Sequence, residues 1–323
     1  MQQVANKSAA DSPTSVRAPR NLIDYVGLVL RGFAMGSADV VPGVSGGTMA
    51  FILGIYEELI DSIRMVGQPA FWQTALSLRI KDAIEMINLR FLIAVFSGIV
   101  LAVLTLAQGL EWMLHNQPVL LWSFFFGLVL ASVVVVGKSI KKWNISLMAA
   151  TFIAAVVAFV IVGLVPLETP NSWWFLFISG ACAICAMILP GISGAFILVL
   201  LGKYQYILGA VNDRDIVTIA FVGAGAILGL VTFAQLLGWL FKRYHDLTVA
   251  LLIGLMIGSL RKIWPWKEVL EFIERKGEII PIVERNILPP ALDGEFAFAL
   301  ALAVVGFVLV FVLDRWANQS KHA

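Results

Sequence analysis

Two short stretches rich in proline, glycine and serine are the chain's candidates for chemistry. VVPGVSGGTMAFILGIY occupies residues 40–56, and LPGISGAFILVLLGKY occupies residues 189–204. At a constant offset the two stretches share these pairs: Pro42 and Pro190, Gly43 and Gly191, Ser45 and Ser193, Gly46 and Gly194, Leu53 and Leu201, Gly54 and Gly202, Tyr56 and Tyr204. Most other pairs are apolar in both copies, so the same polar pattern is repeated inside two very apolar parts of the chain.

A Pro-Gly step can end one helix and let the chain reverse into another. The start of the new helix exposes up to about four backbone N–H groups and a partial positive charge. Phosphate satisfies such donors, and a bilayer offers them no water. With hinges at Pro42 and Pro190, the predicted phosphate site consists of Gly43, Ser45, Gly46, Gly47, Thr48, Gly191, Ser193 and Gly194. The alternative is that small residues only let helices pack closely, but their duplication beside proline favours a site.

An acidic residue lies close to the first stretch. Asp39 precedes Pro42 by three positions, and its counterpart in the second copy is Met187. An ionisable side chain at membrane depth is a functional candidate, so Asp39 could relay a coupling proton or pair with Arg31. Alternatively, it caps a helix or borders a water-filled vestibule.

Three further polar residues are candidates for contact with a substrate. Lys203 ends the second stretch where the first has Ile55, and it could contact an anionic headgroup or extend to the membrane interface. Gln108 and Gln235 occupy matching positions in a second repeated block, TLAQGLEW and TFAQLLGW. They could line a polar path, although an interhelical hydrogen bond is the favoured interpretation.

The composition determines the class of protein that must position these residues. Of the 323 residues 60% are hydrophobic and only 14% are charged, and the mean hydropathy is +0.90. Soluble domains carry about 25% charged residues. Residues 145–165, 216–241 and 296–313 contain no charge, and such runs predict membrane-spanning helices. We therefore expect a polytopic membrane protein.

Several classes of function are not supported by the sequence. The net charge is only +2 and no basic cluster is interleaved with aromatic residues, so nucleic acid is not an expected partner. The three histidines are not spaced as metal ligands, and no cofactor motif is present. We find no HExxH, Walker lysine or paired-carboxylate motif, so we expect neither a metal, a cofactor nor an enzyme.

The two repeated blocks occur in the same order and divide the chain into two homologous halves. We predict a disordered cytoplasmic tail at residues 1–21, repeats at 22–166 and 167–316, and a short tail at 317–323. The expected apolar elements are 22–38, 44–60, 91–113, 118–136 and 145–165, then 172–189, 192–208, 216–241, 247–260 and 296–313. The charged segment 261–295 is expected to lie at the interface, with an amphipathic helix in WKEVLEFIERKG, and residues 71–87 are expected to form a similar helix.

The positions of Lys and Arg predict how these elements cross the membrane. If the first two elements of each half form a re-entrant hairpin, the cluster around Lys138, Lys141 and Lys142 lies in the cytoplasm, as the positive-inside rule requires. Each half then has three crossings, and the second half is inverted relative to the first. The predicted fold is all-α, with two inverted repeats, each of a re-entrant helical hairpin plus three transmembrane helices. This is the arrangement of a secondary transporter with its site between the repeats.

The stretch GSADVVPGVSGGTMAFILGIYEELI resembles the signature of the polyprenyl-phosphate transporter family, and the second copy is also similar. The resemblance implies a flippase that returns undecaprenyl phosphate across the bacterial cytoplasmic membrane, so that the carrier lipid is reused for peptidoglycan and other envelope polymers. It implies a multi-pass inner-membrane protein, with both termini in the cytoplasm. The expected partners are undecaprenyl phosphate and membrane lipids, together with a coupling proton or sodium ion.

Two other functions use the same site chemistry. One is a transporter or channel for a small inorganic anion, and the other is a membrane enzyme that acts on lipid phosphates. A lateral opening toward lipid beside Ser45 and Ser193 would favour a lipid substrate, because a small anion needs no such opening.

Overall fold

The computed structural model describes residues 20–40, 44–164, 166, 169–275 and 278–319. The helices of the first half are α1 (Leu22–Asp39), α2 (Gly46–Ile52), α3 (Tyr56–Val66), α4 (Pro69–Leu76), α5 (Ile80–Met86), α6 (Leu89–Asn116), α7 (Pro118–Gly137) and α8 (Ile145–Ile161). The second half contains α9 (Trp173–Ile188), α10 (Gly194–Leu200), α11 (Tyr204–Asn212), α12 (Ile216–Arg243), α13 (His245–Ser259), β1 (Lys267–Arg275), β2 (Glu278–Asn286) and α14 (Gly294–Gln319).

Several helices begin where the local sequence supplies a cap. The Asn21 side chain accepts from the Asp24 N–H in a capping box at the start of α1. Asn144 caps α8 through the Leu147 N–H, and Asp215 caps α12 through the Thr218 N–H. These short polar side chains satisfy backbone donors that a helix start would otherwise leave without partners.

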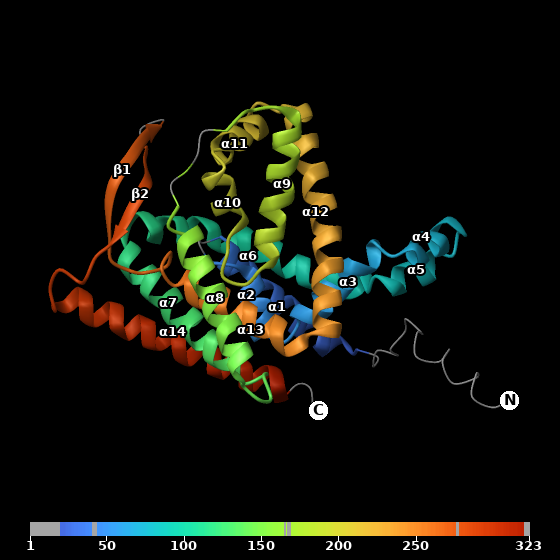
Figure 1. Cartoon of the computed structure of the whole chain (residues 1–323), viewed down its shortest axis with the longest axis horizontal. Helices are drawn as coiled ribbons and strands as arrows, with labels where there is room; N and C mark the ends of the chain where they lie inside the picture. Colours follow the sequence, from blue (N-terminus) through green and yellow to red (C-terminus); the bar gives the residue numbers. More distant parts are fainter. Residues whose placement is uncertain (1–19, 41–43, 165, 167–168, 276–277, 320–323) are drawn as a thin grey trace.

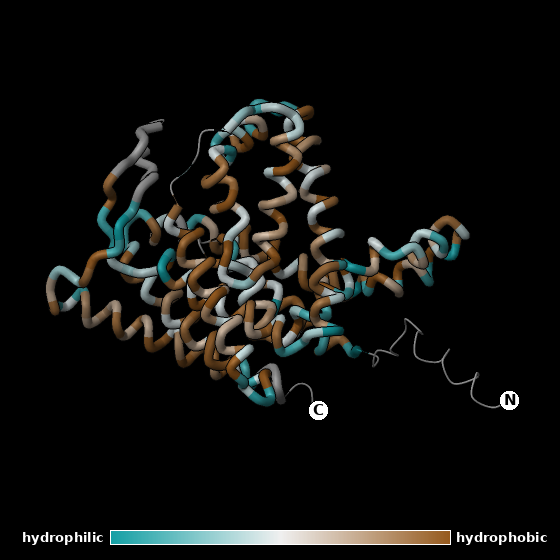
Figure 2. The backbone as a smooth tube through the Cα atoms, in the orientation of Figure 1, coloured by the Kyte–Doolittle hydropathy of each residue, from teal (hydrophilic) through white to brown (hydrophobic). Residues whose placement is uncertain are grey.

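Four helices of the described chain are long and apolar enough to cross a membrane: α6, α7, α12 and α14. The apolar helices α8, α9 and α13 are shorter. Hydrophobic residues cover most of the helical body, whereas the hydrophilic residues gather at helix ends and connecting segments (Figure 2). The protein is therefore an all-α, multi-pass membrane protein, as the composition predicted.

The helices pack in pairs that recur in the two halves of the chain. Helix α1 packs along α6, and α9 packs along α12 (Figure 1). Matching glycines allow both contacts, since a Cβ added at Gly98 would collide with the Val29 carbonyl and one at Gly225 with the Phe177 carbonyl. Small residues let helices approach closely where lipid gives no hydrophobic drive.

The remaining pairs exchange helices between the halves. Helix α7 packs along α14, and α13 packs along α8. Each pair again has glycines at the contact, because a Cβ at Gly127 would collide with the Ala303 carbonyl and one at Gly254 with the Thr151 carbonyl. The last helix of each half is thus held by the other half. The inverted orientation of the halves in a membrane stays a prediction.

The elements expected at 44–60 and 192–208 are not continuous helices. Each is broken at a matching glycine with positive φ, Gly54 (φ 67°) and Gly202 (φ 63°), so that α2 and α10 are separated from α3 and α11. The bend between α10 and α11 is 107°. Helices α2 and α10 have 7 residues each, or about 10 Å, which is too short to cross a hydrocarbon layer of about 30 Å.

The prediction of an amphipathic helix in WKEVLEFIERKG is wrong. The structure has an antiparallel hairpin there, with Lys267 opposite Asn286 and Arg275 opposite Glu278. The spacing of Trp266, Val269, Leu270 and Ile273 fits a helix, but the segment 267–286 is rich in Val, Ile and Phe, which favour strands. The helix expected at 71–87 is divided into α4 and α5. The hairpin and the α4–α5 pair project from opposite ends of the molecule (Figure 1).

Candidate functional site

The two repeated stretches meet in the interior of the protein. We call residues 44–48 the first tip and residues 189–196 the second tip. Ser45 Oγ lies 3.2 Å from the Leu189 carbonyl oxygen, and the Gly191 N–H donates to Thr48 Oγ1 over 3.0 Å. Both side chains are buried. The two repeated stretches are therefore in direct contact.

The first tip satisfies its own helix start. The Gly46 N–H donates to Asp39 Oδ1 over 2.7 Å, and the Gly47 N–H donates to Ser45 Oγ over 3.1 Å. The Thr48 N–H donates to the Ser45 carbonyl oxygen over 3.0 Å. The Asp39 carboxylate thus lies where an anion would bind at the start of α2. The capping interpretation of Asp39 holds, whereas Arg31 lies eight residues back along α1, about 12 Å away at a rise of about 1.5 Å per residue.

The second tip has a different environment. Ser193 makes no side-chain cap, and no acceptor among the described residues takes the N–H groups of Gly194 and Ala195. Met187, the counterpart of Asp39, supplies no carboxylate. Gly191 has φ +92°, and a Cβ on it would lie 2.8 Å from Ser259 Oγ.

Two predicted residues, Pro42 and Gly43, lie outside the described residues. Their counterparts Pro190 and Gly191 are described, and Pro190 is fully buried. The contacts between the tips therefore join Ser45 to Leu189 and Thr48 to Gly191. Gly46 and Gly47 lie between Ser45 and Thr48, while Ser193 and Gly194 follow Gly191 at the start of α10.

Lys203 is a buried structural cation. Only 1% of its surface is exposed. Its Nζ donates to the Thr169 carbonyl oxygen and to Asn171 Oδ1, each over 2.6 Å. It therefore ties the break between α10 and α11 to the segment before α9, and it does not reach the tips.

The matched glutamines have different surroundings. Gln235 Oε1 accepts from Gln68 Nε2 over 2.8 Å, and Gln235 Nε2 donates to the Arg64 carbonyl oxygen over 3.0 Å. This network joins α12 to α3, which is the interhelical role favoured by the sequence. Gln108 is exposed on α6, so the repeat does not preserve that role.

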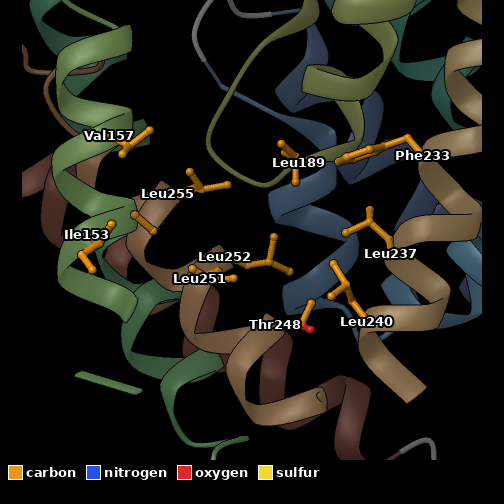
Figure 3. Close-up of a pocket in the computed structure, with 11 residues that line it drawn as sticks. Ile153, Val157, Leu189, Phe233, Leu237, Leu240, Thr248, Leu251, Leu252 and Leu255 are labelled. Atoms are coloured by element: carbon orange, nitrogen blue, oxygen red, sulfur yellow. The ribbon is translucent and has the colours of Figure 1, made fainter. Parts of the chain in front are cut away.

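An apolar cavity of about 330 Å³ adjoins the second tip between α8, α12 and α13 (Figure 3). Its lining residues are Ile153, Ala154, Val157, Leu189, Phe233, Leu237, Leu240, Thr248, Leu251, Leu252 and Leu255. Leu189 belongs to the second tip, and its carbonyl oxygen faces Ser45. The cavity and the junction of the tips are therefore adjacent.

The lining of the cavity is unevenly exposed. Leu252 on α13 is only 2% exposed, while Ile153 on α8 is 60% exposed. The Thr248 hydroxyl donates to the Tyr244 carbonyl oxygen, so the one polar side chain of the lining is already hydrogen-bonded. The cavity suits hydrocarbon. The sequence did not predict it, because its walls come from helices that the two halves exchange.

Comparisons with known proteins agree with this chemistry. Residues 35–280 match the model of an undecaprenyl phosphate translocase-like family. A polyprenyl-phosphate transporter of Vibrio cholerae is 41% identical over 304 residues, which are 92% of this chain and 98% of that protein. A polyprenyl-phosphate transporter of Staphylococcus aureus is 31% identical over 258 residues, which are 73% of this chain and 85% of that protein. No solved structure matches. The chain thus belongs to the undecaprenyl phosphate translocase-like family.

Proposed function

We propose that this protein is a transporter that carries a polyprenyl phosphate, undecaprenyl phosphate in a bacterium, across the cytoplasmic membrane for reuse as a carrier lipid. The observation that carries the proposal is the apolar cavity beside Leu189, next to the junction of the two tips. A polar, anion-compatible junction with an adjacent apolar opening matches a ligand that has a phosphate at one end and an isoprenoid chain at the other.

The apolar lining also favours this function over transport of a small inorganic anion. Such an anion gains nothing from a cavity whose lining is apolar, and it needs no exposed apolar rim such as Ile153. An isoprenoid chain gains about 25 cal/mol for each Å² of apolar surface removed from water. Part of the tail would remain in lipid while the first units occupy the cavity.

The phosphate is assigned to the second tip, with Ser193 and the backbone of Gly191 and Gly194 as the binding groups. The first tip is occupied by Asp39 through its hydrogen bond to the Gly46 N–H. Protonation of Asp39 would weaken this bond and free a donor, so a proton is the coupling ion that the geometry favours over sodium. Both termini are assigned to the cytoplasm, following the distribution of Lys and Arg.

Alternating access requires the junction of the tips to open. The contacts of Ser45 with Leu189 and of Thr48 with Gly191 join the halves across the site. We assign the present arrangement to a closed state, in which the tips bind each other. A phosphate that competes for the Gly191 N–H would loosen this junction and favour the open state.

The test is a sidedness assay with purified protein in vesicles that contain a short-chain polyprenyl phosphate. A phosphatase added outside hydrolyses only the lipid in the outer leaflet. With active protein, the inner-leaflet lipid also becomes accessible, and the hydrolysed fraction rises. A matched variant, Ser45→Ala with Ser193→Ala, is expected to slow this rise, while Thr105→Ala on the exposed surface of α6 leaves it unchanged.

Two readouts separate the alternatives. Uptake of inorganic phosphate into the same vesicles, without movement of the lipid, would assign the protein to small anions. Phosphate release from undecaprenyl diphosphate without added phosphatase would assign it to the enzymes. An unchanged hydrolysed fraction in vesicles with and without folded protein would reject lipid transport.

A further inference from the structure

Two lysines share one carboxylate at the base of the β-hairpin. Lys262 Nζ lies 3.0 Å and Lys267 Nζ lies 3.5 Å from the same oxygen, Glu284 Oε2. Lys262 follows α13, Lys267 begins β1 and Glu284 lies on β2. We call these three residues the lysine cluster. With one carboxylate for two ammonium groups, the cluster carries one uncompensated positive charge.

The cluster borders the second tip. Lys262 Nζ lies 5.3 Å from the ring centre of Phe196, which is in the first turn of α10. Three residues before Lys262, Ser259 faces Gly191 so closely that a Cβ there would lie 2.8 Å from Ser259 Oγ. The end of α13 therefore places Lys262 beside the region assigned to the phosphate.

Burial makes the extra charge unfavourable without a second anion. The Lys267 side chain is 8% exposed, and its Nζ lies 4.3 Å from the ring centre of Trp122. The ring offsets part of the desolvation by a cation–π contact, but a buried charge normally requires a partner of opposite charge. A structural ion pair with Glu284 would need only one lysine.

We infer that Lys262 and Lys267 bind the phosphate of an isoprenoid phosphomonoester as it enters or leaves the second tip. The inference rests on the proposed function and deepens it by assigning the groups that recognise the headgroup. A phosphomonoester carries a charge of about −1.5 to −2 at neutral pH, so it supplies the anion that the cluster lacks. Glu284 holds the two ammonium groups in place and competes with the ligand for them.

The charge state of Lys267 gives the cluster a pH dependence. Burial lowers the pKa of Lys267 to about 8, and Glu284 and Lys262 are the charged groups that face it. Burial also raises the pKa of Glu284, but attraction to both lysines outweighs it and the net shift is downward. Glu284 thus stays ionised, while Lys267 loses its proton as the pH rises through about 8. Binding of the phosphomonoester is expected to weaken over the same range.

The experiment measures binding of a short-chain isoprenyl phosphate to the full chain in nanodiscs of phosphatidylcholine. The corresponding isoprenyl alcohol and inorganic phosphate serve as separate ligands. Lys262→Gln and Lys267→Gln are each expected to weaken binding of the phosphate lipid about tenfold, the effect of losing one charged hydrogen bond. Binding of the alcohol should not change, and Lys142→Gln, on an exposed loop, is the matched control.

A variant with increased affinity tests whether misfolding explains the weaker binding of the lysine variants. Glu284→Gln removes the competing carboxylate, so it is expected to tighten binding of the phosphate lipid severalfold. Lys267→Arg retains the charge at high pH, and it should abolish the weakening of binding above a pH of about 8.

The outcomes distinguish this inference from the proposed function. Unchanged affinity in both lysine variants, with normal binding and transport by the wild type, would reject the role of the lysine cluster in phosphate binding. The proposal of lipid transport would stand. Equal affinity of the wild type for inorganic phosphate overturns the assignment to a lipid. A wild type that neither binds nor moves the isoprenyl phosphate overturns both.

Discussion

The first and second tips share a sequence pattern but differ in what surrounds them. Asp39 and Ser45 occupy the donors of the first tip, whereas the second has Met187 in place of Asp39 and no side-chain cap from Ser193. A cation also lies beside the second tip, because Lys262 Nζ is 5.3 Å from the ring centre of Phe196. A duplicated motif can thus give one tip that supplies its own anion and one that is suited to an external anion.

The break between α2 and α3 also differs from the break between α10 and α11, and here the second half is the more polar. In the first half Ile55 is buried among apolar residues, while Lys203 at the matching position is buried with hydrogen bonds to Thr169 and Asn171. At this one position the second half therefore has a hydrogen-bonded cation where the first half has an apolar side chain. Substitutions at matched positions should consequently have unequal effects.

The largest effect is expected at Gly191. Gly191→Ala forces a side chain onto φ +92° and places its Cβ 3.0 Å from the Met256 Cα, so we expect a loss of about 2–3 kcal/mol of unfolding free energy. Denaturant unfolding in detergent measures it. Gly209→Ala, which has open space around it, is the control. Equal unfolding curves for the two variants would contradict the close packing of the second tip on α13.

The second-largest loss of stability is expected from substitution of Lys203. Lys203→Met leaves the Thr169 carbonyl and the Asn171 amide oxygen without their donor, which costs about 1–3 kcal/mol. The matched change Ile55→Met conserves volume and should cost less than about 1.5 kcal/mol. Thermal unfolding of the two variants side by side measures the difference. A larger loss of stability in Ile55→Met than in Lys203→Met would contradict the expected difference between the two halves.

Asp39 tests the self-capped state of the first tip. Asp39→Ala leaves the Gly46 N–H without an acceptor, so we expect a loss of about 1–2 kcal/mol. Asp39→Asn retains an acceptor oxygen and should lose less, while transport falls if proton release from Asp39 is required. The vesicle assay and thermal unfolding together separate these roles. Stability that drops equally in both variants would show that the charge, and not the hydrogen bond, matters.

The smallest effects are expected at the serines. Ser45→Ala removes a cap and should cost about 1 kcal/mol, whereas Ser193→Ala should change stability by only a few tenths of a kcal/mol, as is usual for positions without a cap. For transport we expect the reverse order, because Ser193 is assigned to the phosphate. Measuring both quantities on both variants tests the comparison. Matching profiles would mean that the two tips are equivalent.

The sequence predicts what depends on local chemistry. The capping residues Asn144 and Asp215 and the repeated tips with their Asp39–Met187 mismatch could all be read from short segments. The hairpin was missed because the apolar spacing around Trp266 also fits a helix, and strand pairing depends on a partner further along the chain. Glu284 meets Lys262 only through that pairing, so no local pattern indicates the lysine cluster.

The cavity illustrates a second limit. Its walls join Val157 of the first half to Leu237 and Leu252 of the second, and each segment alone resembles an ordinary apolar helix. Periodicity indicates which residues are apolar but not which helices are neighbours. The packing of α8 and α14 against the opposite halves depends on tertiary contacts, which local propensity does not encode.

This exchange has a consequence for biosynthesis. Helices α7 and α8 leave the ribosome long before α13 and α14, against which they pack. The first half therefore inserts with two faces still turned to lipid or to insertion factors, the Gly127 face of α7 and the face of α8 that contacts α13, and it completes its packing only when α14 has been made. Insertion of α14 is accordingly expected to be the step that commits both halves to their native packing.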